Sequence, residues 1–163
     1  MTTSQRSARR SDAEQKKFND AMVELWEQRI TFNQLLRLKV LSLNPADVQM
    51  RLDMRPELVG HYAYGRLHGG VISASLDALG GMALMVALSE KHADESAEQV
   101  MHRFGRMGTI DLRVDFLRQG IGHHFIGHAE VTRLGGRIGS TQMRLLNDQG
   151  TLIATAAASF VIA

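Results

Sequence analysis

The alternation of apolar and polar residues predicts six β-strands and two long helices along the chain. Residues 48–54 place apolar side chains between polar neighbours at a period of two, which is typical of a half-buried strand. An apolar run from Leu35 to Leu43 precedes the Asn44-Pro45 turn, so we expect these two strands to form a hairpin. Four further strand-like runs, with glycine-rich or polar connections that favour antiparallel neighbours, cover residues 109–118, 124–133, 137–146 and 151–162.

The N-terminal part of the chain has the spacing of an amphipathic helix. Apolar residues recur at i, i+4, i+7 and i+8, with Lys, Glu and Gln between them: Phe18, Met22, Leu25, Trp26 and Ile30. Asp12 is the expected cap. Burial of the large Trp26 side chain is the main energetic reason for this helix to dock on the rest of the domain.

The central segment from Val71 to Leu88 is apolar on nearly every face, and Asp77 is its one ionisable residue. Its length is near the lower limit for a membrane span. Several Ser and Gly residues dilute it, however, and its flanks are strand-like, so we expect no integral membrane span. A helix of this kind is enclosed by protein. The pattern therefore predicts an α+β domain whose antiparallel sheet wraps one central helix. Residues 89–106 are expected to extend that helix and then to form a mobile excursion.

Length and composition indicate one globular domain over residues 13–163, preceded by a disordered basic tail at residues 1–12. The chain has 163 residues and no Cys, which excludes disulfides, thiolate catalysis and Cys-based zinc sites. Residues 1–17 carry a net charge of +3, which leaves −1 on the remainder. The domain itself is not basic, so we expect no nucleic-acid partner. No secretory signal is visible, which makes a cytoplasmic location the expectation.

Candidate chemistry is concentrated at the entry to the central helix. Gly69 and Gly70 allow a ligand to approach the backbone, and the first amides of a helix lack internal acceptors. The helix dipole adds a positive partial charge there, so a developing oxyanion would be stabilised. The two glycines could instead simply permit close packing against the sheet. Asp77 is harder to explain structurally, because a lone carboxylate in an apolar helix costs free energy unless it is paired.

Several motifs together resemble the hotdog-fold acyl-CoA thioesterases of the phenylacetate-pathway type. The resemblance runs from about Leu35 to the C-terminus. Its motifs are Gly65-x-Leu67-His68-Gly69-Gly70, Leu76-Asp77, Thr109-Ile110-Asp111-Leu112, Ala129-Glu130-Val131-x-Arg133-x-Gly135-Gly136-Arg137 and the Gly150–Ala154 strand start. The resemblance implies a hotdog fold, hydrolysis of acyl-CoA without a metal or cofactor, and a homodimer or a tetramer built from two dimers.

The resemblance also implies a role for each matched residue. Asp77 would activate water or attack the thioester carbon, and the amides of Gly69 and Gly70 would bind the carbonyl oxygen. His68 would orient that loop or the thioester, and Thr109 would position the water, although a β-branched Thr is an equally good strand former. Two further residues, Gly136 and Arg137, would lie near the coenzyme A nucleotide. Many family members carry Asn six residues before the His, where this chain has Tyr62, and we expect Tyr62 to contact substrate.

Helix geometry indicates that one chain does not complete this site. At a rise of about 1.5 Å per residue, Gly70 and Asp77 are separated by roughly 10 Å, too far to act on one thioester carbon. If two central helices pack antiparallel about a two-fold axis, Asp77 of one subunit approaches the His68-Gly69-Gly70 turn of the other. The expected enzyme is therefore a dimer with two composite sites.

The sequence also predicts a substrate preference and leaves two alternative functions to consider. The aliphatic lining of the helix, with Met82 as an adaptable pocket residue, favours medium- to long-chain acyl groups. A 3-hydroxyacyl thioester dehydratase or hydratase would use His61 and Asp77 as an acid/base pair. A non-catalytic acyl-CoA binding protein coupled to DNA recognition is disfavoured, because residues 1–33 offer one helix where a helix-turn-helix needs two. The chain has His123, His124 and His128 close together, but they do not share one face of a strand, so no metal site is expected.

Overall fold

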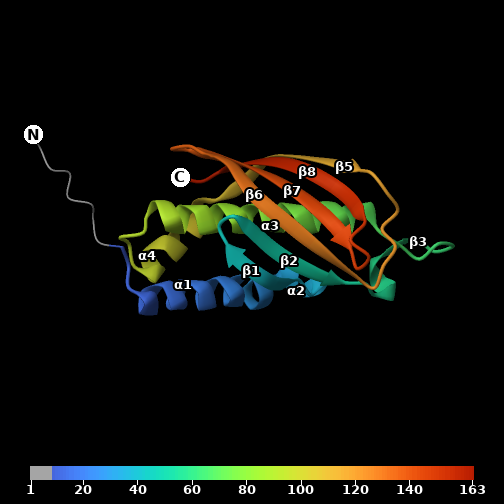
Figure 1. The fold of residues 1–163 in the computed structure, drawn as a ribbon, viewed down its shortest axis with the longest axis horizontal. Helices are drawn as coiled ribbons and strands as arrows, with labels where there is room; N and C mark the ends of the chain where they lie inside the picture. The colour runs from blue at the N-terminus through green and yellow to red at the C-terminus, as the bar shows by residue number, and fades with distance from the viewer. Residues whose placement is uncertain (1–8) are drawn as a thin grey trace, which may run out of the picture.

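The computed structural model describes residues 9–163, and in it a curved sheet covers one side of a long central helix (Figure 1). A shorter N-terminal helix covers the opposite side. The helical elements are α1 (Asp12–Glu24), the π-helical turn η1 (Leu25–Arg29), α2 (Thr31–Leu36), η2 (Pro56–Leu58), α3 (Gly69–Lys91), α4 (Ala97–His102) and η3 (Arg103–Arg106). The strands are β1 (Lys39–Asn44), β2 (Asp47–Asp53), β3 (Val59–His61), β4 (Arg66–Leu67), β5 (Gly108–Phe116), β6 (His124–Leu134), β7 (Ile138–Asn147) and β8 (Leu152–Val161).

The main sheet has six antiparallel strands in the order β1-β2-β6-β7-β8-β5. The alternate residues of β2, β6 and β7 that face α3 are buried, as their period-two pattern predicts. Helix α3 itself lies at the centre, with Leu76, Met82, Leu84 and Met85 fully inaccessible to solvent. The predicted hotdog arrangement of an antiparallel sheet around one apolar helix is confirmed.

The topology of the sheet differs from sequence order at one place. Strand β5 is followed in the chain by β6, yet it crosses over and pairs with β8, so that Thr109 lies opposite Phe160. The short connections between β6, β7 and β8 do give antiparallel neighbours as expected. The crossover leaves β1 and β5 as the two edge strands.

The first predicted strand begins too early in the sequence. Leu35 and Leu36 end helix α2, and β1 begins at Lys39. Between them Arg37 adopts a left-handed conformation with φ of 56°, which terminates the helix. Short apolar runs do not distinguish a helical turn from a strand, and this is the reason for the error. The small hairpin of β3 and β4, which projects from the end of the molecule where α3 begins, was not anticipated either (Figure 1).

The N-terminal helix docks as its apolar spacing predicts, with Phe18, Met22 and Trp26 buried. The indole N–H of Trp26 donates to the carbonyl oxygen of Ala78 in α3 at 3.0 Å, so the ring is both buried and hydrogen-bonded. The capping residue is Ser11 instead of Asp12, because the Ser11 hydroxyl accepts the amide of Glu14.

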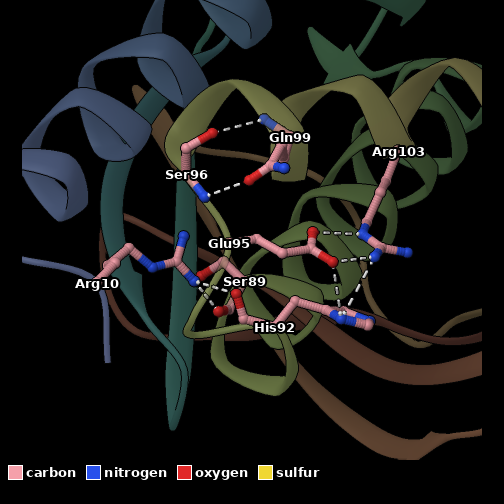
Figure 2. A network of polar contacts seen from close by, with 7 residues as sticks. All are labelled: Arg10, Ser89, His92, Glu95, Ser96, Gln99 and Arg103. Atoms are coloured by element: carbon pink, nitrogen blue, oxygen red, sulfur yellow. Dashed lines mark hydrogen bonds and ion pairs between the residues drawn. The ribbon is translucent and has the colours of Figure 1, made fainter. Parts of the chain in front are cut away.

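Part of the expected basic tail is fixed against the core. Residues 1–8 lie outside the described residues, but Arg9 pairs with Glu90 at 2.8 Å. The Arg10 guanidinium donates to the carbonyl oxygens of Ser89 and His92 (Figure 2). These are carbonyls at the C-terminal end of α3, where a cation is favourable. Residues 9–12 therefore lie against the core, contrary to the expectation for this part of the tail, since Arg10 satisfies the end of the central helix.

Residues 89–106 form ordered structure in place of the expected mobile excursion. Helix α3 continues to Lys91, and α4 then starts with a capping box in which Ser96 and Gln99 bond reciprocally. Arg103 donates to Glu95 with an Nε–Oε2 distance of 3.1 Å, and His92 lies against the same carboxylate. The isolated apolar residues of this polar stretch explain the order, because Val100 of α4 is fully buried and docks that helix.

By length and composition alone α3 could cross a membrane. However, 61% of its most apolar stretch is buried inside the protein, as in the core helix of a soluble domain. The packing of α3 thus accounts for its hydrophobicity without a membrane.

The ion pair between Glu95 and Arg103 predicts a pH-dependent contribution to stability. The hydrogen bond from Arg103 holds the pKa of the Glu95 carboxyl below its usual value, against the opposing effect of burial. Stability from this pair is therefore fully present above the unfolded pKa of about 4.3 and is lost as pH falls through the lower folded pKa. We expect Glu95→Gln to lower the free energy of unfolding by about 0.5–1 kcal/mol at pH 7. In urea titrations this difference should shrink as the pH falls below about 4, and a difference that grows on acidification would contradict the assignment.

Candidate active site

Asp77 lies on α3, facing away from the sheet core and toward the first residues of β5. Its carboxylate Oδ1 accepts a hydrogen bond from the Thr109 hydroxyl at 2.8 Å. Asp77 is half-buried, and among residues 9–163 no other side chain hydrogen-bonds it. One carboxylate oxygen is thus held by Thr109, while the other is available to a ligand. The structure brings these two predicted residues together, although they are 32 positions apart in sequence.

A cavity of about 290 Å³ opens beside this carboxylate. Its polar groups come from Asp77, Thr109 and Asn33. The remaining walls are mostly apolar and come from the N-terminal segment, α3, η3 and the strand ends: Trp26, Ile30, Phe32, Ala74, Ala78, Gly81, Phe104, Met107, Gly108 and Phe160. A largely apolar cavity with a few convergent polar groups is the usual form of a small-molecule site.

The room for this cavity comes from small residues on one face of α3. Ala74, Ala78 and Gly81 follow Asp77's side of the helix at helical spacing. A Cβ on Gly81 would have Phe160 at 3.8 Å as its sole neighbour within 4 Å, which is ordinary contact. A Cβ on Gly80 would instead meet the Met143 sulfur at 2.7 Å, because that position packs against the sheet. The two adjacent glycines therefore do different things: Gly80 permits packing, and Gly81 keeps the cavity open.

His68 caps the N-terminus of α3 with its own ring. The Gly70 amide donates to His68 Nδ1 at 2.8 Å, and the backbone carbonyl of His68 accepts the amides of Val71 and Ile72. Because Nδ1 is an acceptor, the neutral ring carries its proton on Nε2, as an exposed donor. Among the described residues no acceptor bonds the Gly69 amide. The free donors at this helix start are thus the Gly69 N–H and His68 Nε2–H, and the expectation that the Gly70 amide is free needs correction.

Two of the predicted substrate-binding residues do not line the cavity. Met82 is fully buried in the core, one position beyond the residue that does line the cavity, Gly81. Tyr62 is 95% exposed at the tip of the β3-β4 hairpin, where its ring stacks on His61. The helical position of Met82 relative to Asp77 explains why Met82 does not line the cavity, since residues five apart do not share a helix face.

The turn expected near the coenzyme A nucleotide also lies away from Asp77 within one chain. Gly136 and Arg137 are exposed between β6 and β7. The neighbouring Gly135 carbonyl accepts a bond from Lys91, the last residue of α3. This turn therefore lies at the C-terminal end of α3, whereas His68 marks its N-terminal end. One chain does not bring the two together.

The histidine cluster has a structural role in part. His128 Nδ1 lies 3.0 Å from the Asp47 carboxylate, across the β2-β6 pair. Within the described part of the chain, no three His, Asp or Glu side chains are grouped as a metal site requires. His61, the residue that a dehydratase would use with Asp77, is on the exposed hairpin and does not line the Asp77 cavity.

Sequence reasoning missed the walls that the N-terminal segment and η3 contribute. Phe32 and Asn33 of α2 lie in the cavity, but the strand expected from Leu35 hid that helix. Phe104 belongs to the stretch expected to be mobile, but its ring packs edge-on against Trp26, with the ring centroids 5.2 Å apart. Asn33, a polar residue within an apolar pattern, was the sequence feature that could have indicated these walls.

Comparisons with known proteins agree with this architecture. The profile of the family described as "Thioesterase superfamily" matches residues 64–154, which contain the helix entry, Asp77 and Thr109. A medium/long-chain acyl-CoA thioesterase, YigI, of Salmonella typhimurium is 33% identical over 139 residues, covering 85% of this chain and 90% of that protein. Its Escherichia coli counterpart is 32% identical with the same coverage. A crystal structure from Shewanella oneidensis, described as related to the thioesterase superfamily, aligns with a TM-score of 0.87 at 32% identity. It covers 94% of this chain and 100% of that one.

The family match covers more than half of the chain, and the relatives cover most of it. Both agree with the hotdog arrangement of the sheet and α3 and with the carboxylate beside an apolar cavity. The chain therefore belongs to the thioesterase superfamily and is a hotdog-fold thioester hydrolase.

Proposed function

We propose that the protein hydrolyses medium- to long-chain aliphatic acyl-CoA, with Asp77 as its catalytic carboxylate. The observation that carries this proposal is the placement of Asp77 in the mouth of an apolar cavity, fixed by Thr109. The relatives named as medium/long-chain acyl-CoA thioesterases support the substrate class. The lining of small, aliphatic and aromatic side chains is apolar enough to hold an alkyl chain that lies along α3.

The hydrogen bond from Thr109 to Asp77 Oδ1 leaves Oδ2 to receive a proton from water. The water oxygen then bonds to the thioester carbon, and the carbon–sulfur bond breaks as the tetrahedral intermediate collapses. The coenzyme A sulfur leaves as a thiolate and takes the proton back from Asp77. A direct attack by Oδ2 on the carbon would break the carbon–sulfur bond, expel the coenzyme A thiolate and leave an anhydride; water would then hydrolyse the anhydride, regenerate Asp77 and supply the thiol proton, with the same geometry.

The developing oxyanion needs donors that Asp77 does not supply. The Gly69 amide and His68 Nε2–H are free, and they lie at the positive end of the α3 dipole. Gly69 and Asp77 are eight residues apart on one helix, about 12 Å, so the donors must come from the α3 of a second subunit. Thr109 is placed beside the carboxylate and supports Asp77 directly.

Features of the chain's surface support such a dimer. Strand β5 pairs with β8 on one side and, among residues 9–163, has no strand on the other, which leaves a sheet edge. Exposed apolar side chains gather on β5 and in the loop that follows it: Ile110, Phe116, Leu117 and Ile121. The same surface includes Phe116, whose ring lies near Gly69, so an interface there would run beside the helix start. We propose a homodimer, with a tetramer of two dimers as its further assembly.

The location of the protein, its partners and its coenzyme A contacts are also proposals. We infer a cytoplasmic location. We also infer no nucleic-acid partner, because α1 uses its apolar face for the core and the short α2 that follows lines the Asp77 cavity, so neither presents a recognition face. A coenzyme A contact by Gly136 and Arg137, or by Tyr62, would have to come from the partner subunit, since neither lines the Asp77 cavity in its own chain.

Removal of the Asp77 charge tests the central assignment. We expect Asp77→Asn to lower kcat by at least about 100-fold, because the amide does not accept the proton from water. Thr109→Val should give a smaller loss, and Thr109→Ser, which keeps the hydroxyl, should stay close to wild type. The measurement is thiol release from decanoyl-CoA, with melting temperatures as the control for folding. Wild-type turnover by Asp77→Asn would end the proposal.

The shared site predicts complementation between two inactive variants. Gly69→Pro removes the free amide, while Pro is tolerated at the first helical position and the extended His68 backbone is compatible with a following Pro. Gly69→Ala adds a Cβ but keeps the amide, so it is the matched control. We expect Gly69→Pro to lose about 100-fold or more in kcat. Co-expression of Gly69→Pro with Asp77→Asn should restore activity, since mixed dimers contain one intact site.

Tagged heterodimers, purified away from both homodimers, make that experiment quantitative. About half of the wild-type activity per dimer is the expected value. Heterodimers that form but are as inactive as their parents would show that the two groups act within one chain.

Gly81 predicts the chain-length profile. A side chain at this position enters the cavity one turn beyond Asp77 without disturbing the sheet contact. We expect the wild type to prefer medium to long acyl groups in a profile from butanoyl- to hexadecanoyl-CoA. Gly81→Val should lower kcat/KM for the long chains by about tenfold and change it little for the short ones. An unchanged profile in a folded Gly81→Val protein would place the acyl chain elsewhere.

A further inference from the structure

The hairpin of β3 and β4 carries a cluster of exposed aromatic side chains at the N-terminal end of α3 (Figure 1). Both tyrosines of the chain lie in its turn, Tyr62 with 95% and Tyr64 with 62% of the side chain exposed. Tyr62 is the most exposed large hydrophobic residue among residues 9–163. Single exposed hydrophobic residues are ordinary, but a group of them on one projecting turn marks a binding surface.

The rings of this turn already pack on one another. The His61 ring lies nearly parallel to the Tyr62 ring, with an interplanar angle of 16° and centroids 5.7 Å apart, and 4.8 Å from the Tyr64 ring. The backbone of the turn is held, because the amides of Tyr64 and Gly65 both donate to the His61 carbonyl oxygen. Gly65 takes the positive φ of 59° that this turn requires. Tyr62 is therefore presented on an ordered turn, with its outer face open to another planar group.

An unpaired cation lies beside these rings. The Arg66 guanidinium lies over the Tyr64 ring, 4.8 Å from its centroid. Its Nε atom has no hydrogen-bond partner, and no carboxylate of residues 9–163 pairs with the guanidinium. The hairpin itself, residues 59–67, contains no Asp or Glu. A guanidinium in such surroundings suits a phosphate group.

The hairpin is joined directly to the helix start that carries the His68 and Gly69 donors. The His68 amide donates to the Leu58 carbonyl oxygen at 2.9 Å, which connects the base of the hairpin to α3. Arg66 is two residues before His68, at most about 7 Å along an extended chain, and Tyr62 is four residues beyond Leu58, at most about 13 Å. A ligand that leads outward from the helix start along the hairpin thus meets the guanidinium first and the Tyr62 ring second.

Acyl-CoA carries a phosphate group and a planar ring in this same order. Its pantetheine arm joins the sulfur to the pyrophosphate through about twelve bonds, as many as four residues of extended chain, which span at most about 14 Å. The adenine ring follows the pyrophosphate, and it is the one aromatic group of an aliphatic acyl-CoA. A base that stacks on an aromatic side chain gains about tenfold in affinity. The order and the spacing of the groups on the hairpin therefore match those of the nucleotide.

We propose that this hairpin binds the nucleotide part of the coenzyme A substrate, with Tyr62 stacked on the adenine ring and Arg66 paired with the pyrophosphate. The inference rests on the proposed function and deepens it. It assigns the nucleotide to the same subunit whose His68 and Gly69 bind the thioester oxygen. Both hairpin residues therefore act in the composite site that receives Asp77 from the second copy of the chain.

Decanoyl-pantetheine, which lacks the nucleotide, is the matched substrate for the first experiment. We expect wild-type kcat/KM to be at least about tenfold higher for decanoyl-CoA than for decanoyl-pantetheine. Tyr62→Ala should lower this preference by about tenfold, whereas Tyr62→Phe, which retains the ring, should preserve it. A preference that persists in folded Tyr62→Ala would overturn the inference. An equal loss for both esters would also overturn it, because the hairpin would then serve the fold or the assembly.

Arg66→Gln tests the cation. This variant should also lower the preference for decanoyl-CoA, and the wild-type preference should weaken as salt rises from about 0.05 to 0.5 M, because salt screens an exposed charge pair. The control is Arg133→Gln, which makes the same charge change at an exposed position near the opposite end of α3. Equal effects of the two variants would indicate general electrostatic attraction and count against a site on the hairpin.

Binding of coenzyme A itself separates this inference from the proposed function. Calorimetry should show about tenfold weaker binding to Tyr62→Ala than to the wild type, with ultracentrifugation to compare their assembly. If affinity depends on Tyr62 but no ester is hydrolysed, the hairpin contact is supported and the proposed hydrolysis fails. Equal affinities, or loss of the dimer in Tyr62→Ala, would overturn the inference while wild-type hydrolysis still stands.

Discussion

Helix α3 has no polar face, and the rest of the chain is arranged to cover it. The sheet reaches one side closely because small residues meet the helix there: a Cβ on Gly80 would lie within 3.0 Å of atoms from β7 and β8, and one on Gly127 would lie 2.7 Å from Leu79. Such close packing is what apolar burial requires. The opposite side is covered by separate pieces, α1 through α2 and η3, with Trp26 bonded to the α3 carbonyl at Ala78. The sheet side leaves a void of about 10 Å³, whereas the side covered in pieces leaves a cavity of about 290 Å³.

The polar groups of the site lie where that second covering is incomplete. Asp77 is the one ionisable group on the apolar part of α3, and it emerges where β5 begins, so Thr109 reaches it. A carboxylate this close to the core is costly unless it is hydrogen-bonded, and the bond from Thr109 offsets part of that cost. Asn33 enters the same gap from α2. The incomplete covering of α3 therefore both leaves the cavity and places the polar groups of the site beside it.

The sequence was sufficient where one physical signal dominated. Period-two alternation located five of the main strands closely, and the uninterrupted apolar run located α3 with Asp77 upon it. Prediction from the sequence failed where two sequence signals competed, or where the deciding contact was not encoded in a local pattern. Leu35 and Leu36 satisfy a strand pattern and a helical turn equally well, and only the left-handed Arg37 decides between them. Met82 was chosen by residue type, but the helical phase of α3 points it into the core. The use of the Gly70 amide by the His68 ring depends on a side-chain rotamer, which no sequence pattern encodes.

The capping of α3 by His68 has a consequence for how the site is built. A helix start that left both glycine amides free would carry two orphaned donors in the absence of substrate. Here the ring of His68 satisfies Gly70, and its remaining N–H on Nε2 belongs to an exposed side chain at the start of the helix. The His68 Nε2–H thus replaces the Gly70 N–H as a donor for a ligand, and the imidazole extends farther from the backbone than an amide N–H does. Because α3 is rigid and buried along its length, its own Asp77 cannot approach these donors. Under the proposed function the donors and the carboxylate meet across two copies of the helix, and each subunit carries two separated halves of a site.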